Sequence, residues 1–548
     1  MTRCKSFCFL LVVWVVSLVQ LHSNNVPSAS SYNPSETLMI RMRDGTFLPT
    51  DIYLPPDLSK KYPVILIRNP SGRQSEPWIT FADLAKAGFI VAFQDTRSAL
   101  DTEGKTMPYF SDGWGEQKDG FDAVEALAKY RFSNGKVGTA GYSAPGITQL
   151  MLAPTAPPSL CAQHIGVAAS NLYEHAIYPG GCLQKNQVEG WLGMYAKHPS
   201  MMDVLQEEPL YNNFWQNFNT IEVADKVSVP ALMYGGWYDT FLQGTIDAFI
   251  ARQERGAEGA KGTQKLIIGP WTHTWPRNTR LGEFDIPATG KSPPWDISPL
   301  AWFNHHLKGH SSPIENVPPV TYYVMGPFDG SSSKGNIWKT APAWPVPAQL
   351  THFYLADGGR LLKSEAPDTL IKQTYTIDPS NPVPTLGGPN LFLEAGPKDQ
   401  TSIEAREDVL TYTTAPLAED TEITGRLQAK IYFQRPTHNA DIIVRLSDVY
   451  PDGKSILIHD GVYHYSAKQP GICYNDITPQ LAQIDLWSTS IVIAQGHRIR
   501  VSISGSNYPR YEKTSLPPTT HIGATKKYSL TFLTGGDFAS HIILPLVD

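Results

Sequence analysis

The sequence is poor in several features that would point to particular functions. Only five of its 548 residues are cysteine and 18% are charged, with a formal net charge of −6 at pH 7. This small acidic excess gives no basic surface for nucleic acid. The chain has no HExxH, no paired CxxC and no acidic calcium loop, which disfavours a metal site. No glycine-rich loop fits a nucleotide, so we expect neither a metal nor a cofactor.

Long apolar runs are also absent, with one exception at the N-terminus. Arg3 and Lys5 precede an almost wholly apolar stretch over residues 7–21, and small and polar residues follow it. This layout is typical of a secretory signal peptide over residues 1–23, so we expect a secreted or periplasmic protein. An uncleaved membrane anchor is the alternative, although about 15 residues are short for a span. No later segment has the length and apolarity to cross a bilayer.

Cysteine contributes little to the expected fold. Removal of the signal peptide would leave Cys161, Cys182 and Cys473, which allow one disulfide at most. Export makes a bond between Cys161 and Cys182 chemically permissible, but spacing does not establish a pairing. Isolated cysteines buried in the core are the simpler expectation.

A repeated pattern of strand, turn and helix is present between residues 34 and 312. Short apolar runs that end in loops occur at 62–70, 88–97, 136–143, 164–170, 229–239 and 265–273. Such runs are typical of fully buried parallel strands. Their alternation with helical segments predicts an α/β fold, a parallel sheet covered on both faces. Residues 39–55 predict instead a hairpin that turns at Asp44 and Gly45.

Two further regions depart from this pattern. Residues 183–225 carry helical spacing without a strand, which predicts a helical cap between a first core segment, 34–182, and a second, 226–312. From residue 317 to 548 short alternating segments are separated by Gly, Pro, Asn and Asp. That composition is typical of an antiparallel sandwich or jelly roll, so we expect a C-terminal β jelly-roll domain.

A serine stands at the turn after one predicted strand. Ser143 lies in the hexapeptide GYSAPG (141–146), directly after the strand-like KVGTA. A serine between a strand and a helix projects its hydroxyl above the sheet edge, as in the nucleophile elbow of α/β-hydrolases. The second glycine of that motif is displaced by one residue because Pro145 takes its place. Alone, the hexapeptide also fits an ordinary strand-to-helix turn.

Two later strands end in the residue types that a nucleophilic serine requires. A serine hydroxyl needs a base, and the base needs a carboxylate to orient it. Asp239 ends VPALMYGGWYD, and His273 ends KLIIGPWTH. The chain order Ser, Asp, His is the one found in α/β-hydrolases. We therefore predict a catalytic triad of Ser143, His273 and Asp239, with a purely structural histidine as the alternative for His273.

Longer sequence blocks support the same residues. They include QKDGFDAVEALAKYRFSNGKVGTAGYSAPG (117–146), GGWYDTF (235–241), IIGPWTH (267–273) and QGHRIRVSISGSNYPRYEK (495–513). On these blocks, which extend over nearly all of the mature chain, the sequence resembles a family of serine hydrolases. That family groups cocaine esterase and other CocE/NonD hydrolases with glutaryl acylases, α-amino acid ester hydrolases and Xaa-Pro dipeptidyl-peptidases. The resemblance implies an α/β-hydrolase core with a helical cap and a C-terminal jelly roll, and the same nucleophile, acid and base.

The resemblance also implies where the reaction's oxyanion is bound. The family uses the backbone N–H after the nucleophile, here that of Ala144, and a tyrosine hydroxyl from an R-N-P-Y motif. In this chain RNP (68–70) is followed by Ser71. Loss of one oxyanion donor costs about 100- to 1000-fold in turnover. We expect a slower enzyme or a different donor, for which Ser71 itself is a candidate.

The predicted function is cleavage of a small-molecule ester or amide through an acyl-enzyme. In the family, enzymes specific for amino esters carry carboxylates near the catalytic acid that bind the substrate ammonium. Here Thr240, Phe241 and Leu242 follow Asp239, which disfavours that specificity. An Xaa-Pro dipeptidyl-peptidase is the alternative among enzymes, although we identify no anchor for a substrate amine. A non-catalytic binding protein on a hydrolase scaffold is the alternative outside them. The sequence leaves a homo-oligomer open.

Overall fold

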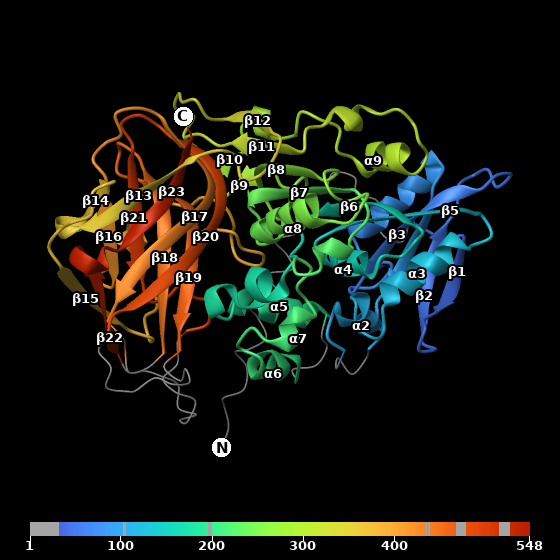
Figure 1. Cartoon of the computed structure of the whole chain (residues 1–548), viewed down its shortest axis with the longest axis horizontal. Helices are drawn as coiled ribbons and strands as arrows, with labels where there is room; N and C mark the ends of the chain where they lie inside the picture. The colour runs from blue at the N-terminus through green and yellow to red at the C-terminus, as the bar shows by residue number, and fades with distance from the viewer. Residues whose placement is uncertain are drawn as a thin grey trace, which may run out of the picture.

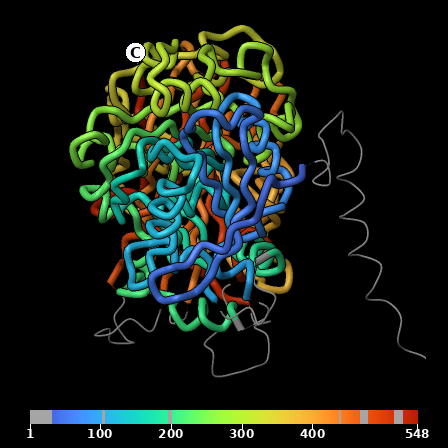
Figure 2. Tube along the Cα trace, turned by 90° about the vertical axis from the view of Figure 1, so that its right-hand side faces the viewer, coloured from blue at the N-terminus to red at the C-terminus, as the bar shows by residue number. Residues whose placement is uncertain are grey.

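A computed structural model describes residues 32–101, 106–195, 200–434, 436, 439–466, 478–513 and 527–547. An α/β part lies on the right of Figure 1 and a part rich in β-strands lies on the left. Seen from the right-hand side, in Figure 2, the α/β part is in front of the orange and red C-terminal segments. The expected signal peptide, 1–23, and Cys473 fall outside the described residues.

The α/β part contains a ten-stranded sheet. Its strands are β1 Glu36–Arg41, β2 Phe47–Tyr53, β3 Tyr62–Asn69, β4 Ile90–Asp95, β5 Ser133–Tyr142, β6 Leu160–Gly166, β7 Ala231–Tyr238, β8 Lys265–Thr272, β11 Val320–Val324 and β12 Ile337–Ala341. Their order is β1-β2-β4-β3-β5-β6-β7-β8-β11-β12. Neighbours from β4 to β11 are parallel, whereas β1, β2 and β12 pair antiparallel. The six predicted parallel strands and the predicted hairpin are therefore confirmed.

Helices follow the strands and pack on them. The principal ones are α3 Asp119–Ala128, α4 Ala144–Leu152, α8 Leu242–Arg255 and α9 Pro299–His306. Helices α3 and α4 pack on β5, α8 packs on β7 and α9 packs on β6. Every side chain of β3, β4 and β7 is buried, as expected for parallel strands with helices on the sheet.

Three helices lie within residues 183–225, the range expected for a cap. They are α5 Lys185–Tyr195, α6 Ser200–Glu207 and α7 Asn213–Gln216. Helix α5 lies between the two parts of the molecule in Figure 1. The Lys185 ammonium is 2.9 Å from the Glu512 carboxylate, so the cap is ion-paired to the C-terminal part.

Strands β11 and β12 correct the predicted boundary at residue 317. The short alternating segment at 321–326 predicts a strand of the C-terminal domain, but β11 runs parallel to β8 and β12 pairs with β11. Every residue of β11 is buried, and the Trp237 indole N–H donates to the Tyr323 carbonyl at 2.7 Å. Pairing with β8 satisfies backbone groups that would otherwise be unpaired. Because of this pairing, the core sheet extends to Ala341. The alternating pattern predicts a strand but does not indicate which sheet the strand joins.

The C-terminal part is an eleven-stranded, almost wholly antiparallel domain. Its strands are β13 Gln349–Ala356, β14 Arg360–Lys363, β15 Ile371–Ile377, β16 Val409–Thr413, β17 Thr421–Phe433, β18 Ala440–Val449, β19 Ser455–Tyr465, β20 Gln480–Ile493, β21 Arg498–Ser504, β22 Tyr528–Thr534 and β23 His541–Val547. Their order is β15-β22-β17-β23-β13-β14-β16-β21-β18-β19, with β20 on β17. Only β14 and β16 pair parallel among these described strands. The predicted C-terminal β-domain is confirmed.

The end of β7 is bonded to the β-domain. The Tyr238 hydroxyl donates to the Leu457 carbonyl at 3.0 Å, and the Tyr238 ring stacks on the His459 ring. His459 Nε2 lies 2.9 Å from the Trp237 carbonyl, so this nitrogen carries the hydrogen. Burial lowers the pKa of His459 to about 4, which keeps the imidazole neutral near pH 7. The residue that follows β7, Asp239, thus starts from a strand end fixed by both domains.

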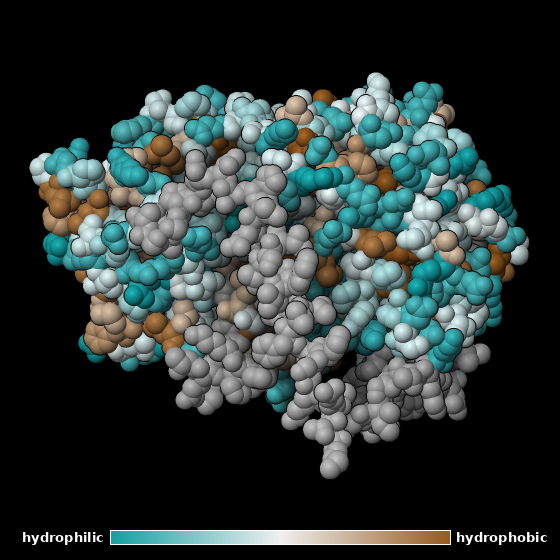
Figure 3. Space-filling view, turned by 180° about the vertical axis from the view of Figure 1, so that it is seen from behind, coloured by the Kyte–Doolittle hydropathy of each residue, from teal (hydrophilic) through white to brown (hydrophobic). Residues whose placement is uncertain are grey.

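Three further features concern the state of the two described cysteines, the distribution of apolar residues on one face and the length of the helices. Cys161 is half-buried and Cys182 is buried, and both are free thiols, so the structure has no disulfide between them. On the face in Figure 3, apolar and polar residues are interspersed. No helix within the described ranges is long and apolar enough to cross a membrane.

Candidate active site

Three side chains from separate strand ends form one hydrogen-bonded chain. His273 Nε2 lies 2.9 Å from Ser143 Oγ, and His273 Nδ1 lies 2.6 Å from Asp239 Oδ1. Asp239 is completely buried, whereas Ser143 and His273 retain slight exposure. The structure therefore brings together the serine, histidine and aspartate that the sequence predicts.

Ser143 sits on a strained turn between β5 and α4. Its φ is +62° and its ψ is −126°, a conformation that costs a non-glycine residue about 1–3 kcal/mol. A Cβ on Gly141 would lie 2.4 Å from the Pro145 Cβ, and one on Gly146 would lie 2.8 Å from the Gly166 carbonyl oxygen. Both glycines are thus required by close approach. Pro145 falls in the first turn of α4, where it displaces no helical hydrogen bond.

The loop after Asp239 links the site to the cap. The Thr240 hydroxyl is hydrogen-bonded to Gln187 of α5, and Gln187 also donates to the Ala176 carbonyl at 2.9 Å. The Phe241 ring packs edge-on against the His273 ring, with 5.4 Å between centroids. These contacts restrict the positions of the Asp239 carboxylate and the His273 imidazole relative to each other.

Two groups near Ser143 can donate to an oxyanion. The Ala144 N–H opens helix α4, where the first N–H groups have no partner within the helix. Ser71 N donates to Asn69 Oδ1 at 2.9 Å, and the Ser71 carbonyl accepts from the Ser75 hydroxyl at 2.5 Å. The Ser71 hydroxyl oxygen is buried and has no hydrogen-bond partner among the described residues. The Ser71 backbone is therefore held by two hydrogen bonds.

Ser143 opens into a cavity of about 500 Å³. Ser71, Tyr142 and His273 line it from the core. The Trp78 indole N–H donates to the Tyr142 carbonyl at 2.9 Å, and burial raises the pKa of the Tyr142 phenol, so this side chain remains a neutral hydroxyl. The cavity has room for a substrate group of moderate size.

Two walls of this cavity are absent from the sequence prediction. Trp191 and Met194 of cap helix α5 form one, and Leu391 and Phe392 of the β-domain form the other. A Cβ on Gly190 would lie 2.3 Å from the Phe392 ring, so this glycine lets the β-domain approach the cap. The only sequence signal was the apolar run Leu391 to Leu393 in a loop bounded by glycines, and its position beside Ser143 becomes apparent only with the fold.

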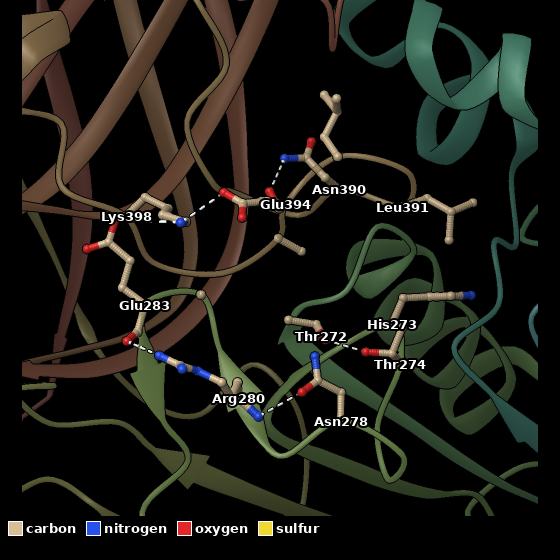
Figure 4. Close-up of a pocket in the computed structure, with 13 residues that line it drawn as sticks. Thr272, His273, Thr274, Asn278, Arg280, Glu283, Asn390, Leu391, Glu394 and Lys398 are labelled. Carbon is tan, nitrogen blue, oxygen red and sulfur yellow. Dashed lines mark hydrogen bonds and ion pairs between the residues drawn. The ribbon is translucent and has the colours of Figure 1, made fainter. Parts of the chain in front are cut away.

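A second cavity, of about 580 Å³, adjoins the first at His273, Thr274 and Leu391. Figure 4 shows charged side chains from both domains around it, including Arg280 and Lys398. The site is therefore flanked by one mainly apolar and one polar cavity. Within the described ranges, no cluster of His, Cys, Asp or Glu has the geometry to hold a metal ion.

Comparison with known proteins connects this site to a family. The X-Pro dipeptidyl-peptidase (S15 family) profile matches residues 44–202 and 191–275, and that of the X-Pro dipeptidyl-peptidase C-terminal non-catalytic domain matches 313–543. Cocaine esterase of Rhodococcus sp. (strain MB1 Bresler) is 28% identical over 592 residues, covering 94% of this chain and 99% of that protein. The chain belongs to this S15 family of serine hydrolases. The predicted resemblance is confirmed.

Solved structures share the fold of this S15 hydrolase. An aminopeptidase from the marine sediment archaeon Thaumarchaeota archaeon has a TM-score of 0.79 at 20% identity and covers 96% of this chain and 99% of its own. An α-amino acid ester hydrolase has a TM-score of 0.76 at 22% identity and covers 96% and 98%. At these identities the likeness concerns the fold alone, an α/β-hydrolase core with a C-terminal β-domain.

Proposed function

We propose that this S15 hydrolase cleaves carboxylic esters or amides, with Ser143 as nucleophile, His273 as general base and acid, and Asp239 as the orienting carboxylate. The hydrogen-bonded chain from Asp239 through His273 to Ser143 carries the proposal. Esters are favoured because the relative that matches nearly the whole chain is named as an esterase. No cofactor takes part.

The proposed reaction has two halves. Ser143 Oγ attacks the substrate carbonyl while His273 Nε2 takes its proton, and the Ala144 N–H and the Ser71 hydroxyl donate to the oxyanion. The tetrahedral intermediate collapses, His273 protonates the departing alcohol or amine, and an acyl-enzyme remains. Water then attacks the acyl carbonyl with His273 as base, and the acid product leaves Ser143.

A fluorophosphonate probe and an aryl ester test the proposal together. The native protein should be labelled and should hydrolyse the ester, whereas Ser143→Ala should do neither, because loss of a triad nucleophile costs on the order of 10⁶ in turnover. Retention of more than a few per cent of either signal in Ser143→Ala would overturn the assignment. A native protein without labelling would favour the non-catalytic binding function.

An Xaa-Pro dipeptidyl-peptidase is the second candidate. Both matching profiles carry that description, and the exposed carboxylate of Glu76 on the wall of the Ser143 cavity is a candidate partner for a substrate amine. An Xaa-Pro arylamide tested beside an acyl ester separates the two activities. Preference for the arylamide, lost in Glu76→Gln, would establish the peptidase.

Export is the proposed destination. The basic residues and the apolar stretch over 7–21 support a cleaved signal peptide. N-terminal sequencing of the protein produced in a secreting host should find a start close to Asn24. Full-length protein in the membrane fraction would favour the anchor instead.

A further inference from the structure

We infer that the second cavity beside His273 receives the far end of the leaving group, and that this leaving group is polar, with several hydrogen-bond donors and acceptors. This inference rests on the proposed function and adds a substrate class to it. Its basis is the position of the cavity, its charged lining and the contacts that fix its walls.

The position of the cavity relates it to the leaving group. In a triad reaction the histidine protonates the leaving group, which therefore lies on the histidine side of the scissile bond. The polar cavity includes His273 but not Ser143 in its lining, whereas the apolar cavity includes both. In Figure 4 the His273 ring points away from the charged side chains. Only a leaving group that extends past His273 and Thr274 therefore reaches them.

The lining carries equal numbers of positive and negative groups. The Lys398 side chain is 17% exposed, and its ammonium lies 2.9 Å from the Glu394 carboxylate and 3.6 Å from that of Glu283. Arg280 Nη2 donates to the Glu283 carbonyl at 2.6 Å. Lys398 is the least exposed of these ions, since the Arg280, Glu283 and Glu394 side chains are 61%, 46% and 82% exposed. An alkyl group placed against Lys398 would remove its water contacts without replacing them, whereas a hydroxyl or carboxylate group would replace them. The cavity thus favours a polar ligand.

Close backbone contact between the two domains fixes the floor of this cavity. Gly282 lies in the turn between β9 (Arg280–Leu281) and β10 (Phe284–Asp285). A Cβ on Gly282 would lie 2.2 Å from the Pro397 carbonyl oxygen, and one on Gly396 would lie 2.3 Å from Gly282 N. The turn and the β-domain loop therefore have no room to shift toward each other.

Hydrogen bonds also hold the β-domain loop that forms the other wall. Gly388 and Gly396 donate to each other's carbonyls at 2.8 and 3.0 Å. Asn390, only 4% exposed, donates to the Glu394 carbonyl at 2.9 Å. The backbone of this loop is already ordered, so the loop has little entropy left to lose on binding.

Three esters of one aromatic acid test the inference: ethyl, glyceryl and carboxymethyl. The glyceryl ester supplies a neutral polyol and the carboxymethyl ester supplies a carboxylate. Because all three share an acyl-enzyme, kcat/KM reports the step that involves the leaving group. The ratio of native to variant kcat/KM cancels the intrinsic reactivity of each ester. Arg280→Gln and Lys398→Met remove one cation each from the cavity.

The control is Lys454→Met, which removes a lysine that is 62% exposed and 3.6 Å from Asp452 on the surface of the β-domain. We expect Lys398→Met or Arg280→Gln to lower kcat/KM about tenfold for at least one polar ester, as for loss of one charge-assisted hydrogen bond. For the ethyl ester, kcat/KM should change less than twofold in these variants. Lys454→Met should leave kcat/KM unchanged for all three esters. Loss on the carboxymethyl ester alone assigns an anionic leaving group; loss on the glyceryl ester assigns a polyol.

Equal ratios for all three esters in both variants would overturn the inference while leaving the proposed function intact. Failure of the proposed function has a different signature, since the native protein would then hydrolyse none of the three esters, including the ethyl ester.

Discussion

At the scale of single residues, the geometry around Ser143 concerns the backbone as much as the side chain. The φ of +62° at Ser143 directs its hydroxyl toward His273 and leaves the next N–H, that of Ala144, at the start of a helix. Helix N-termini carry partial positive charge. The same turn therefore presents the proposed nucleophile, Ser143, and a proposed donor to the oxyanion, the Ala144 N–H.

Ser71 provides the sharpest test at this scale. Its hydroxyl is buried without a partner among the described residues and lines the Ser143 cavity. We expect Ser71→Ala to lower kcat about 100-fold with little change in KM, because an oxyanion donor acts mainly in the transition state. Steady-state kinetics on a small ester measures both constants.

Ser75→Ala is the matched comparison, since it removes the hydrogen bond that holds the Ser71 backbone but keeps the Ser71 hydroxyl. It should cost far less than Ser71→Ala. An unchanged kcat in Ser71→Ala would show that Ala144 acts without Ser71. A tenfold gain in Ser71→Tyr would then indicate that the serine hydroxyl is too short to reach the oxyanion.

At the scale of elements, a single glycine lets helix α5 pack against the β-domain at the cavity beside Ser143. Gly190 lies under the Phe392 ring, at a separation that leaves no room for a Cβ. Gly193 lies on the same helix with no atom within 4 Å of the position its Cβ would take. The same glycine-to-alanine substitution would therefore meet the Phe392 ring at position 190 and open space at position 193.

We expect Gly193→Ala to raise the unfolding temperature slightly, because alanine favours a helix by about 1 kcal/mol over glycine. Gly190→Ala should lose that gain and displace Phe392, lowering kcat/KM about tenfold for a bulky aromatic acyl ester and less for an acetyl ester. Calorimetry and kinetics on both esters measure these effects. Identical behaviour of the two variants would contradict the contact between Gly190 and Phe392.

At the scale of the whole molecule, the two domains share the site. Tyr238 and His459 join the end of β7 to the β-domain, and Met325 is bonded to β20 through the Ser490 carbonyl at 2.9 Å. Leu391 and Phe392 complete the cavity at Ser143. The β-domain is thus part of the binding surface and of the support for Asp239.

Truncation tests this dependence. A chain that ends after Ala341 keeps the whole core sheet but loses the β-domain, which should leave an insoluble or inactive product because buried side chains such as Trp237 and Tyr238 would lose their cover. Solubility and ester hydrolysis are measured against full-length Ser143→Ala as a folded, inactive control. A soluble fragment with native activity would show that the β-domain is dispensable.

The sequence predicts the core sheet and the residues at its strand ends well, but it predicts poorly which residues form the walls of the Ser143 cavity. Strand periodicity and the turn residues predict the parallel sheet, and the positions of Ser143, Asp239 and His273 at strand ends predict their proximity. The strand at 320–324 is assigned to the wrong sheet because alternation is the same in both. Leu391 and Phe392 are missed because their proximity to Ser143 depends on how two domains meet, which local pattern does not encode.

The loop that carries Leu391 and Phe392 has a consequence for biosynthesis. It belongs to a domain in which the first strand, β13, pairs with the last, β23. A ribosome releases Ser143 early, but β13 gains this partner only after His541–Val547 has emerged. Ser143 therefore leaves the ribosome long before the strand that pairs with β13 is available, and the cavity wall formed by Leu391 and Phe392 is completed only after that strand has paired.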